Sequence, residues 1–475
     1  MANSRKSTHR NRPVSLQDAF QRALEDILAR VFVSGRTVAC RIAVAYSGGL
    51  DSSMLLKLCG EYAQINAVTL YAFHVHHGLS PHADEWAEHC RRTAEKQGAV
   101  YQMATVSVDE GDPRGVEEAA RIARYGALEQ LCRQHEVPLL LTGHHQDDQA
   151  ETMLLQLARG AGLAGLAGMA PLQRDHLLLG DDLYLGRPLL QIGRKQLAEA
   201  ADALELPHVV DESNSDRRYR RNAVRLQLLP SMEAIFPNCA PAIARSANHV
   251  QSAAALLDDL AAIDLASCLA ADGRRLQLDE MRKLPERRMI NLLRYWIRQQ
   301  YASTLSAAQL AELCEQMFNA AEDARPVLDA GTLRLWRFRG HLFARRKPGR
   351  LEAAPMTLSW NGETAIDVPS WHGRLHSRRD GSPGLPERAL RDSSVQLMPR
   401  SGGERMKTAP NRPTKAVKTL YQENGIPPWQ RERLPLVYVN GSLVFAAGIG
   451  MDARFTTAEN GIVLHWDDNS GDYDL

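Results

Sequence analysis

The chain has 475 residues, of which 44% are apolar and 24% are charged, and its formal net charge is +1. This length and composition predict a globular protein of about three domains and exclude a disordered or fibrous chain. Because the net charge is close to zero, binding to nucleic acid would have to come from local basic patches rather than from the chain as a whole.

Seven cysteines are scattered along the chain, and no two of them form a Cys-x-x-Cys pair. Such an odd, scattered set predicts free thiols in a reducing compartment rather than a disulfide framework or a zinc site. No apolar run reaches the roughly 18 residues that a membrane span requires. Residues 1–13 are polar and basic and lack the apolar segment of a secretion signal, so we expect a short tail on a cytoplasmic protein without a membrane partner.

The spacing of apolar residues predicts a helix at 15–33, followed by strands that alternate with helices. This alternation predicts an α/β fold with βαβ units and a parallel sheet. Ligands of such sheets bind beyond the carboxyl ends of the strands, so segments 47–52, 74–77 and 143–151 are expected to converge there. The predicted strands are 40–46, 68–75, 100–106 and 138–143, and the predicted helices between and after them are 52–64, 82–97, 115–134 and 146–159.

The segment Ser47-Gly48-Gly49-Leu50-Asp51-Ser52 joins the first strand to its helix. The first-turn N–H groups, two glycines and the hydroxyls of Ser47 and Ser52 together form a cradle suited to an anion. The carboxylate of Asp51 lies where a magnesium ion beside phosphate oxygens would need an oxygen ligand. An ordinary capped strand–helix junction is the alternative interpretation.

Three carboxylates, those of Asp147, Asp148 and Glu151, begin the helix at 146–159, directly after His144 and His145. They are suited to bind magnesium, or to recognise an ammonium group and later accept its proton. They are also favourable near a helix N-terminus without any further function. A zinc hydrolase site is a further alternative, but no third ligand is obvious.

The helix at 115–134 carries Arg121 and Arg124 on one charged face. These arginines either form exposed ion pairs, which contribute little to stability, or face phosphate as guanidinium forks. The glycine-rich segment 160–168 is equally compatible with a mobile lid and with a plain connector.

A dense basic segment lies at 211–225, where a tyrosine and two asparagines accompany five arginines. This composition favours contacts with the phosphates and bases of RNA, because five like charges so close together repel one another on a plain solvated helix. The arginines are Arg217, Arg218, Arg220, Arg221 and Arg225.

The remainder of the chain is predicted to be helical to about residue 325. A short strand at 334–339 follows, with Trp336 and Phe338 on one face and Arg337 and Arg339 on the other. The aromatic face is expected to pack in a core, and the basic face is suited to an RNA backbone. A hairpin is predicted around Asn440-Gly441, in a C-terminal part whose basic residues include Arg405, Lys415 and Lys418.

Six motifs occur in order between residues 38 and 230, and together they resemble the bacterial tRNA-Ile-lysidine synthetases. These enzymes are N-type ATP pyrophosphatases, a group with a pyrophosphate-binding loop (PP-loop). The motifs are Ser47 to Ser52, His74-Val75-x-His77-Gly78-Leu79, Glu117-x-Ala-Ala-Arg121-x-x-Arg124-Tyr125, His144-His145-x-Asp147-Asp148-x-x-Glu151-Thr152, Arg187-Pro188-Leu189, and Asp211-x-Ser213-Asn214 with Arg221-Asn222-x-x-Arg225.

The resemblance implies a domain order and an activity. A tail and helix (1–37) would precede a Rossmann-like PP-loop catalytic domain (38–230). A mainly helical tRNA-binding domain (231–346), a linker with poorly defined strands (347–394) and a small α+β tRNA-binding domain (395–475) would follow. The implied enzyme is a ligase that uses ATP to join free L-lysine to ring carbon 2 of the wobble cytidine of tRNA(Ile) with a CAU anticodon. Lysidine would form through an adenylated tRNA, with release of pyrophosphate and AMP. The codon and amino-acid specificity of the tRNA would thereby switch from methionine to isoleucine.

The resemblance also implies site roles. ATP would bind at Ser47 to Ser52, and Mg²⁺ at Asp51 and Asp148. Catalysis would involve Asp51, Asp147, Asp148, Glu151 and Arg121. By analogy alone, the family's dimeric habit leaves a homodimer open, and no DNA partner is expected. The implied tRNA-binding residues are Arg124, Arg217, Arg218, Arg220, Arg221, Arg225, Arg405, Lys415 and Lys418.

Three alternative functions share some of these features. A tRNA thiolase (2-thiolation) would share the loop and basic patches but would need catalytic cysteines, and none of the cysteines pairs here. An amidotransferase would need a glutaminase domain, which is not visible. A non-catalytic RNA-binding module would keep the arginines but has no need for an intact PP-loop.

Overall fold

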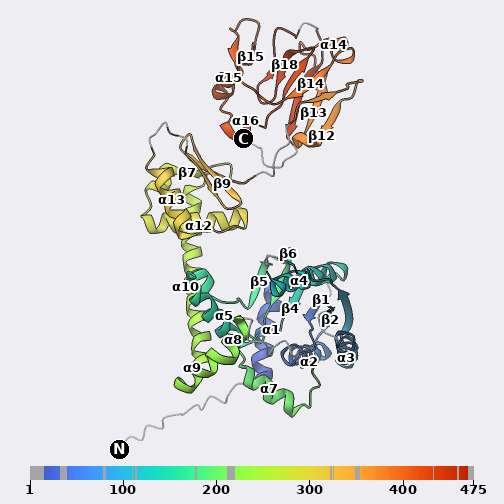
Figure 1. Ribbon diagram of the computed structural model, residues 1–475, viewed down its shortest axis with the longest axis vertical. Coiled ribbons are helices and arrows are strands. Elements are labelled where there is room, and N and C mark those ends of the chain that lie inside the picture. The colour runs from blue at the N-terminus through green and yellow to red at the C-terminus, as the bar shows by residue number, and fades with distance from the viewer. Residues whose placement is uncertain are drawn as a thin grey trace, which may run out of the picture. The chain divides into compact units, whose positions relative to one another are not determined.

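The computed structural model divides the chain into two compact units, Met1–Leu257 and Asp258–Leu475 (Figure 1). Within the described residues, no helix is both long enough and apolar enough to cross a membrane. The described residues are 15–32, 40–76, 78, 82–109, 111–112, 115–176, 179–210, 220–320, 324, 326–347, 354–431, 433–456 and 459–468.

The first unit is built on a six-stranded sheet in the order β3-β2-β1-β4-β6-β5. All neighbouring strands run parallel except β5, which is antiparallel to β6 at the edge. The strands are β1 (Cys40–Ala45), β2 (Val68–His76), β3 (Val100–Thr105), β4 (Leu139–Leu141), β5 (Leu172–His176) and β6 (Gly180–Gly186).

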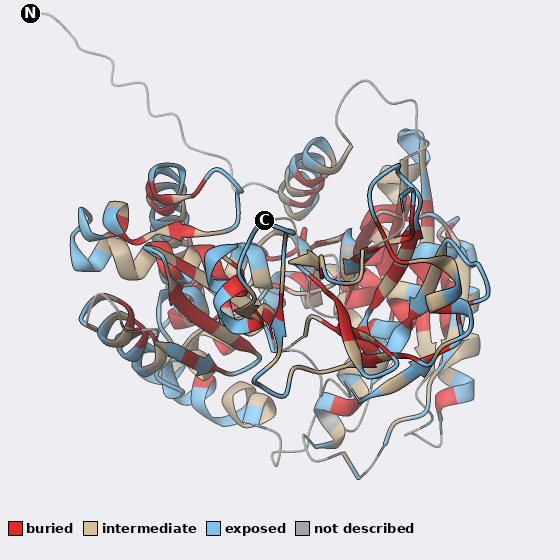
Figure 2. Cartoon of the chain, turned by 90° about the horizontal axis from the view of Figure 1, so that it is seen from above, coloured by how far each residue is buried: buried red, intermediate tan, exposed pale blue. Residues whose placement is uncertain are grey.

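Helices cover both faces of this sheet because its buried strands are apolar on both sides. On β1, Ile42 and Val44 point to one core with Phe20 and Leu55, whereas Ala43 points to the opposite core with Leu128. Figure 2 shows the strands of both units as the most buried segments. The helices are α1 (Leu16–Val31), α2 (Leu50–Ile65), α3 (Ala83–Lys96), α4 (Val116–Gln134), α5 (Gln146–Ala158), α6 (Leu163–Leu166) and α7 (Arg194–Ala203).

A second helical segment completes the first unit. It consists of α8 (Arg220–Ala223), a π-helical turn η2 (Val224–Leu228), α9 (Leu229–Ile235) and the start of α10 (Cys239–Cys268). Leu229 and Cys239 pack against Ala150 on α5, so this segment is anchored to the helix that carries the predicted carboxylates.

The second unit begins with an antiparallel sheet in the order β7-β10-β9-β8. Trp296, Leu310 and Leu335 lie in the core between this sheet and its helices. Its elements are β7 (Leu276–Gln277), α11 (Leu278–Arg282), α12 (Glu286–Tyr301), α13 (Ala307–Phe318), β8 (Val327–Ala330), β9 (Leu333–Phe338) and β10 (His341–Arg346).

Further sheets fill the rest of the second unit, in the orders β11-β14-β17-β18-β19, β12-β13-β20 and β15-β16. Residues 356–391, within the segment predicted to be a linker, contribute three strands and two short helices to this part. The elements are β11 (Met356–Leu358), β12 (Ala365–Val368), η3 (Pro369–Trp371), β13 (Gly373–Arg378), α14 (Glu387–Arg391), β14 (Val395–Met398), β15 (Arg405–Met406), β16 (Lys415–Ala416), α15 (Val417–Glu423), α16 (Pro428–Arg431), β17 (Leu436–Val439), β18 (Ser442–Ala446), β19 (Gly450–Met451) and β20 (Val463–Asp468).

The predicted α/β fold is confirmed, and each helix and strand predicted between residues 15 and 159 ends within two residues of its prediction. The hairpin at Asn440-Gly441 is also confirmed. The prediction missed β5 and β6, because β5 has one apolar residue, Leu172, and β6 begins with Gly180-Asp181-Asp182, so neither shows the pattern that identifies a strand. The tail at residues 1–14 lies outside the described residues.

Two helix-interior glycines of the first unit give a matched test of its packing. A Cβ on Gly60 would lie 2.9 Å from the backbone oxygen of Gln97, whereas a Cβ on Gly126 would meet nothing within 4 Å. We expect Gly126→Ala to stabilise the fold by about 0.4–1 kcal/mol through the unfolded state, and Gly60→Ala to destabilise it by about 1–3 kcal/mol through overpacking. Urea unfolding of both variants would measure the difference, and equal effects would contradict the close approach.

Candidate active site

The predicted anion cradle lies at the carboxyl end of β1. Gly49 is the N-cap of α2 and supplies no side chain to the first-turn N–H groups, and Gly48 adopts a positive φ of 84°. The hydroxyls of Ser47 and Ser52 lie 3.0 Å apart, and Ser52 donates to the Gly49 carbonyl. The N-terminus of α2 therefore has no side-chain cap, and its first-turn N–H groups and helix dipole are suited to an anion in the loop.

The end of β4 packs directly against this loop. A Cβ on Gly143 would lie 3.0 Å from the carbonyl carbon and oxygen of Asp51 and 3.1 Å from the backbone nitrogen of Ser52. A side chain at this position would force the Asp51–Ser52 backbone to shift by a few tenths of an ångström, so glycine favours this approach. The contact holds the start of α5 beside the start of α2, so the two predicted half-sites do converge.

His145 connects the two half-sites. Its side chain is fully buried, with Nε2 3.7 Å from Asp51 Oδ2 and 3.4 Å from Asp148 Oδ2. His145 is also the N-cap of α5, and its backbone N–H donates to Asp148 Oδ2 at 2.9 Å. Burial alone would lower the pKa of His145, but the carboxylates of Asp51, Asp148 and Asp147 outweigh it and raise that pKa. The carboxylates thus hold the pKa of His145 above its ordinary value in spite of burial, a coupling that sequence reasoning missed.

Four side chains form a buried charge cluster between α5 and the α8–η2 segment. Arg221 donates to Glu151 at 2.9 Å and to Asp148 at 3.0 Å, and Arg225 donates to the same two carboxylates at 2.6 and 2.8 Å. Glu151 is 1% exposed. Burial would raise the pKa of Asp148, but His145 and Arg221 hold it well below its ordinary value. The structure thus joins residues that the sequence had assigned to separate carboxylate and RNA-binding groups.

The other two polar residues at the start of α5 have different surroundings. Asp147 accepts a hydrogen bond from the backbone N–H of Arg194 at 2.8 Å, at the first residue of α7. Asp147 therefore caps the N-terminus of α7, where the N-cap residue, Gly193, has no side chain to do so. Burial lowers the pKa of the half-buried His144 to about 3, against the opposing effect of Asp148, so its imidazole is neutral at pH 7.

The remaining predicted site residues are not part of this cluster. Arg121 and Arg124 are exposed on α4, each with its guanidinium 5.8 Å from the Tyr125 ring, and Arg220 is exposed at the start of α8. Arg217 and Arg218 lie outside the described residues. In the second unit Arg405 donates to the Thr414 carbonyl, Lys415 pairs with Glu423, and Lys418 is exposed.

The carboxylate of Asp51 is the best candidate for a magnesium ligand. Its Oδ1 is buried and has no hydrogen-bond partner among the described residues. Within the same residues, no group of three or more His, Cys, Asp or Glu side chains forms a metal site. This arrangement fits Mg²⁺, which binds through one or two carboxylates together with substrate phosphates. By contrast, Asp148 Oδ1 already accepts hydrogen bonds from two guanidinium groups.

All seven cysteines are free, and burial is the largest cause of a raised pKa at every one of them. The pKa of Cys90 and that of Cys132 rise to about 12. These thiols are therefore protonated at neutral pH, and a protonated thiol is a poor nucleophile.

Comparison with known proteins defines the class of the first unit. Residues 16–232 match the PP-loop domain model, so the sheet and loop described above form a PP-loop domain. Residues 276–343 match the TilS substrate binding domain, and residues 395–466 match the TilS substrate C-terminal domain.

Curated relatives identify the family. The chain is 40% identical over 442 residues to the tRNA(Ile)-lysidine synthase of Burkholderia pseudomallei (strain K96243), covering 86% of this chain and 89% of the relative. It is 38% identical over 454 residues to that of Ralstonia nicotianae (strain ATCC BAA-1114 / GMI1000), covering 91% and 96%. The chain therefore belongs to the tRNA(Ile)-lysidine synthase family. This assignment, together with the protonated thiols, favours a ligase over the tRNA thiolase alternative.

Arg225 offers a test of the buried charge cluster. We expect Arg225→Met to lower the free energy of unfolding by about 3–5 kcal/mol, because two buried carboxylates lose a partner. The Asp148 pKa is lowered by folding, so its ion pairs stabilise the protein above the pKa of the free carboxyl and stop doing so as the pH falls through the folded value. The difference in free energy of unfolding between the unsubstituted protein and Arg225→Met should thus be constant near pH 7 and become smaller below about pH 4. Denaturant unfolding at several pH values would measure it.

Arg133 provides the control, because it pairs with Glu129 at 3.0 Å in an exposed position on α4 of the same unit. Removal of an exposed pair changes stability by about 1 kcal/mol or less. An Arg225→Met deficit no larger than that of Arg133→Met would contradict the structural importance of the cluster.

Proposed function

We propose that the chain catalyses the ATP-dependent ligation of free L-lysine to ring carbon 2 of the wobble cytidine of tRNA(Ile) with a CAU anticodon. The observation that carries this proposal is the match, over most of the chain, to relatives named tRNA(Ile)-lysidine synthase. The convergence of an anion-binding loop with a buried carboxylate cluster gives that reaction a chemical basis.

The reaction has two steps. First, the cytidine carbonyl oxygen attacks the α-phosphorus of ATP, and the bond to the β,γ-pyrophosphate breaks. Then the ε-amine of lysine attacks ring carbon 2, the carbon–oxygen bond breaks and AMP leaves. The first-turn N–H groups of α2, with Ser47 and Ser52, would hold the phosphates and stabilise the charge that develops on the leaving pyrophosphate. Asp51 would hold Mg²⁺, which neutralises phosphate charge when bound.

Glu151 and Asp148 are proposed to receive the lysine side chain. Carboxylates that attract the guanidiniums of Arg221 and Arg225 also attract an ammonium ion, which would take over some of these hydrogen bonds as a guanidinium shifts aside. An ammonium beside two guanidiniums would lose its proton more readily, because like charges disfavour its charged form. Glu151 is our candidate for the proton acceptor, and His145 would orient Asp51 and Asp148 and keep Asp148 ionised.

Exposed cationic residues are proposed to contact the tRNA backbone. Arg121, Arg124 and Arg220 lie on the first unit, and Arg405 and Lys418 on the second, whose matched models are named for the substrate. Such contacts fix the register of the RNA without reading its sequence.

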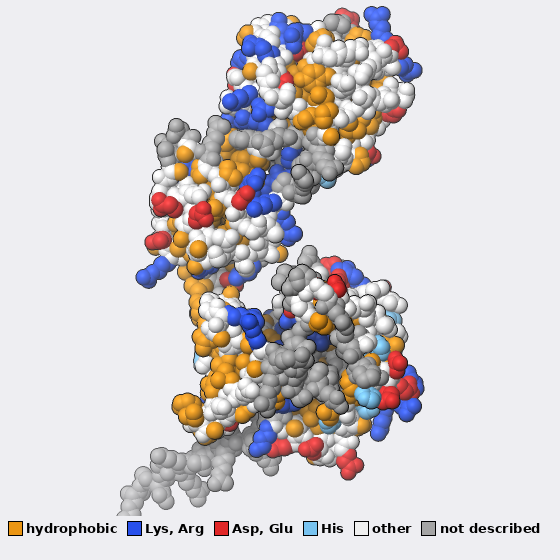
Figure 3. Space-filling model, in the orientation of Figure 1, with side chains coloured by type: hydrophobic (Ala, Val, Ile, Leu, Met, Phe, Trp, Pro, Cys, Tyr) orange, Lys and Arg blue, Asp and Glu red, His pale blue; other side chains and the backbone are white. Residues whose placement is uncertain are grey.

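A homodimer and a cytoplasmic location are also proposed. Apolar side chains gather over α9 and α10 in Figure 3. The exposed apolar residues of this segment include Ile235 and Phe236 at the end of α9 and Leu256 in the second half of α10. Exposed apolar groups of this kind favour an interface with another copy. Seven free thiols, and substrates that include ATP and tRNA, support a cytoplasmic enzyme.

The direct test is incubation with ATP, labelled lysine and total tRNA, followed by nucleoside analysis. We expect lysidine, together with AMP and pyrophosphate in equal amounts. We expect Asp51→Asn to lower lysidine and AMP formation by about 100-fold or more while the far-UV circular dichroism stays unchanged, because a magnesium ligand is lost without a change in side-chain volume. Turnover near the unsubstituted rate would contradict the role of Asp51.

Glu151→Gln should separate the two steps. We expect the KM for lysine to rise, or the second step to slow, by about tenfold or more, while the KM for ATP changes little. Single-turnover assays of pyrophosphate release and of lysidine formation would measure each step. Adenylated tRNA that forms and reacts with lysine at the unsubstituted rate would exclude Glu151 from this role.

A further inference from the structure

A glutamine in the first turn of α5 is tied to the segment that follows this helix. The side-chain amide of Gln149 accepts a hydrogen bond from the backbone N–H of Met169 at 2.7 Å and donates one to the Met169 carbonyl at 2.8 Å. Gln149 is 1% exposed. An amide that satisfies both backbone groups of one residue copies the paired bonds of neighbouring β-strands, so it fixes Met169 relative to α5.

Gly168 is fitted to this amide. A Cβ on Gly168 would lie 2.8 Å from Cδ and 3.1 Å from Nε2 of Gln149, and closer still to Oε1. Gly168 also has a φ of 65°, a conformation that favours glycine. The end of the glycine-rich segment is therefore shaped around the side chain of Gln149.

The same stretch of backbone is anchored to the sheet by Arg187, which directly follows β6. Residues 168–171, which we call the strap, lead from the glycine-rich segment into β5. The Nη1 atom of Arg187 donates to the Ala170 carbonyl at 2.7 Å, and the backbone N–H of Arg187 donates to the Pro171 carbonyl at 2.8 Å. Arg187 is buried. The strap thus connects the end of β6 to the first turn of α5.

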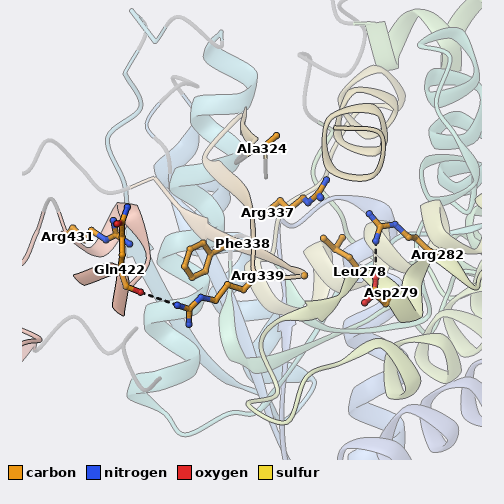
Figure 4. A pocket seen from close by; sticks show the side chains of 10 residues that line it. Leu278, Asp279, Arg282, Ala324, Arg337, Phe338, Arg339, Gln422 and Arg431 are labelled. Carbon is orange, nitrogen blue, oxygen red and sulfur yellow. Dashed lines mark hydrogen bonds and ion pairs between the residues drawn. The ribbon is translucent and has the colours of Figure 1, made fainter. Parts of the chain in front are cut away.

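Arginines bonded to backbone carbonyls join segments of the second unit in the same way. Beside a cavity of about 500 Å³, Arg339 donates to the Gln422 carbonyl at 3.1 Å and thereby ties the β9–β10 turn to α15 (Figure 4). A guanidinium carries five N–H donors, so it can hold more than one carbonyl at a time. The contacts of Arg187 with the strap are anchoring contacts of this kind.

The first turn of α5 is therefore held on three sides. Successive residues of an α-helix point about 100° apart. Asp147 accepts a hydrogen bond from the N-terminus of α7, Asp148 accepts two from the α8–η2 segment, and Gln149 is bonded to the strap. Under the proposed function, the lysine ammonium disturbs only the contacts with the α8–η2 segment. The other two contacts then have to maintain the orientation of the helix.

We propose that Gln149 is a positioning residue for lysine, which keeps Asp148 and Glu151 directed at the ammonium while a guanidinium shifts aside. The inference rests on the proposed function, because that function supplies the lysine. Gln149 acts through Met169 and the backbone of α5, and a small displacement of a reacting group is enough to slow a reaction strongly. The PP-loop has its own contacts, between Ser47 and Ser52 and within α2, so the first step should depend less on the strap.

Gln149→Met in the full chain removes both hydrogen bonds and keeps the length of the side chain. We expect the KM for lysine to rise, or the second step to slow, by about five- to thirty-fold, the range that corresponds to one or two lost hydrogen bonds. The KM for ATP and the rate of pyrophosphate release should change by less than about twofold. Steady-state and single-turnover assays of pyrophosphate release and lysidine formation would measure these quantities.

Two controls separate positioning from stability. Gln21→Met on α1 removes an exposed hydrogen bond to Glu25 and should change neither step. Ile27→Val removes a methylene from the buried core and should lower the Tm without a selective effect on lysine.

Gly168→Ala approaches the same contact from the strap. Its added Cβ would push the amide of Gln149 off Met169, so we expect the same selective effect on lysine. In a Gln149→Ala background the amide is absent, and Gly168→Ala should then add nothing to the lysine effect. The strain of a positive φ would still lower the Tm in both backgrounds.

Several outcomes would overturn the proposal. One is an unchanged lysine step in Gln149→Met, and another is an equal loss for lysine and ATP, which would assign Gln149 to the fold alone. Fully additive effects of Gln149→Ala and Gly168→Ala on the lysine step would also contradict it. If the unsubstituted chain forms lysidine, these results concern Gln149 only. If it forms none, the proposed function fails, and the positioning role fails with it.

Discussion

The first unit depends on one buried interaction, the cluster in which Asp148 and Glu151 on α5 receive Arg221 and Arg225. Two carboxylates removed from water are costly unless cations and hydrogen bonds compensate them, and here two guanidiniums do so at 2.6–3.0 Å. The compensation comes from a segment some 70 residues later in the chain. The charges that hold α5 to the α8–η2 segment are therefore the same charges that the reaction is proposed to use.

Much of the first unit could be predicted from sequence, because its signals are local. Apolar runs of strand length separated by amphipathic helices specify a parallel sheet, and a parallel sheet specifies where its loops converge. Ser47 to Ser52 could be identified as an anion site from the residues of a single turn. Of the two glycines in that turn, Gly48 adopts a positive φ, whereas Gly49 is an N-cap in extended conformation.

What sequence could not provide was the partner of each charge. The pairing of Glu151 with Arg221 and Arg225 depends on how α8 and η2 pack on α5, and no periodicity encodes that. Asp147 and Asp148 are adjacent in sequence and looked equivalent. Because they point in different directions from α5, Asp147 binds the N-terminus of α7, whereas Asp148 joins the charge cluster. The burial of His145 between carboxylates was equally hidden, because it depends on how the start of α5 packs against the start of α2.

The close approach of Gly143 to the first turn of α2 has a mechanical consequence. The PP-loop and the start of the carboxylate helix touch backbone to backbone, without flexible side chains between them. Such a contact is stiff, so these two parts of the site behave as a single rigid body on the timescale of binding. Adjustment to substrates of different size then falls to the α8–η2 segment, whose arginine rotamers can change without breaking a strand.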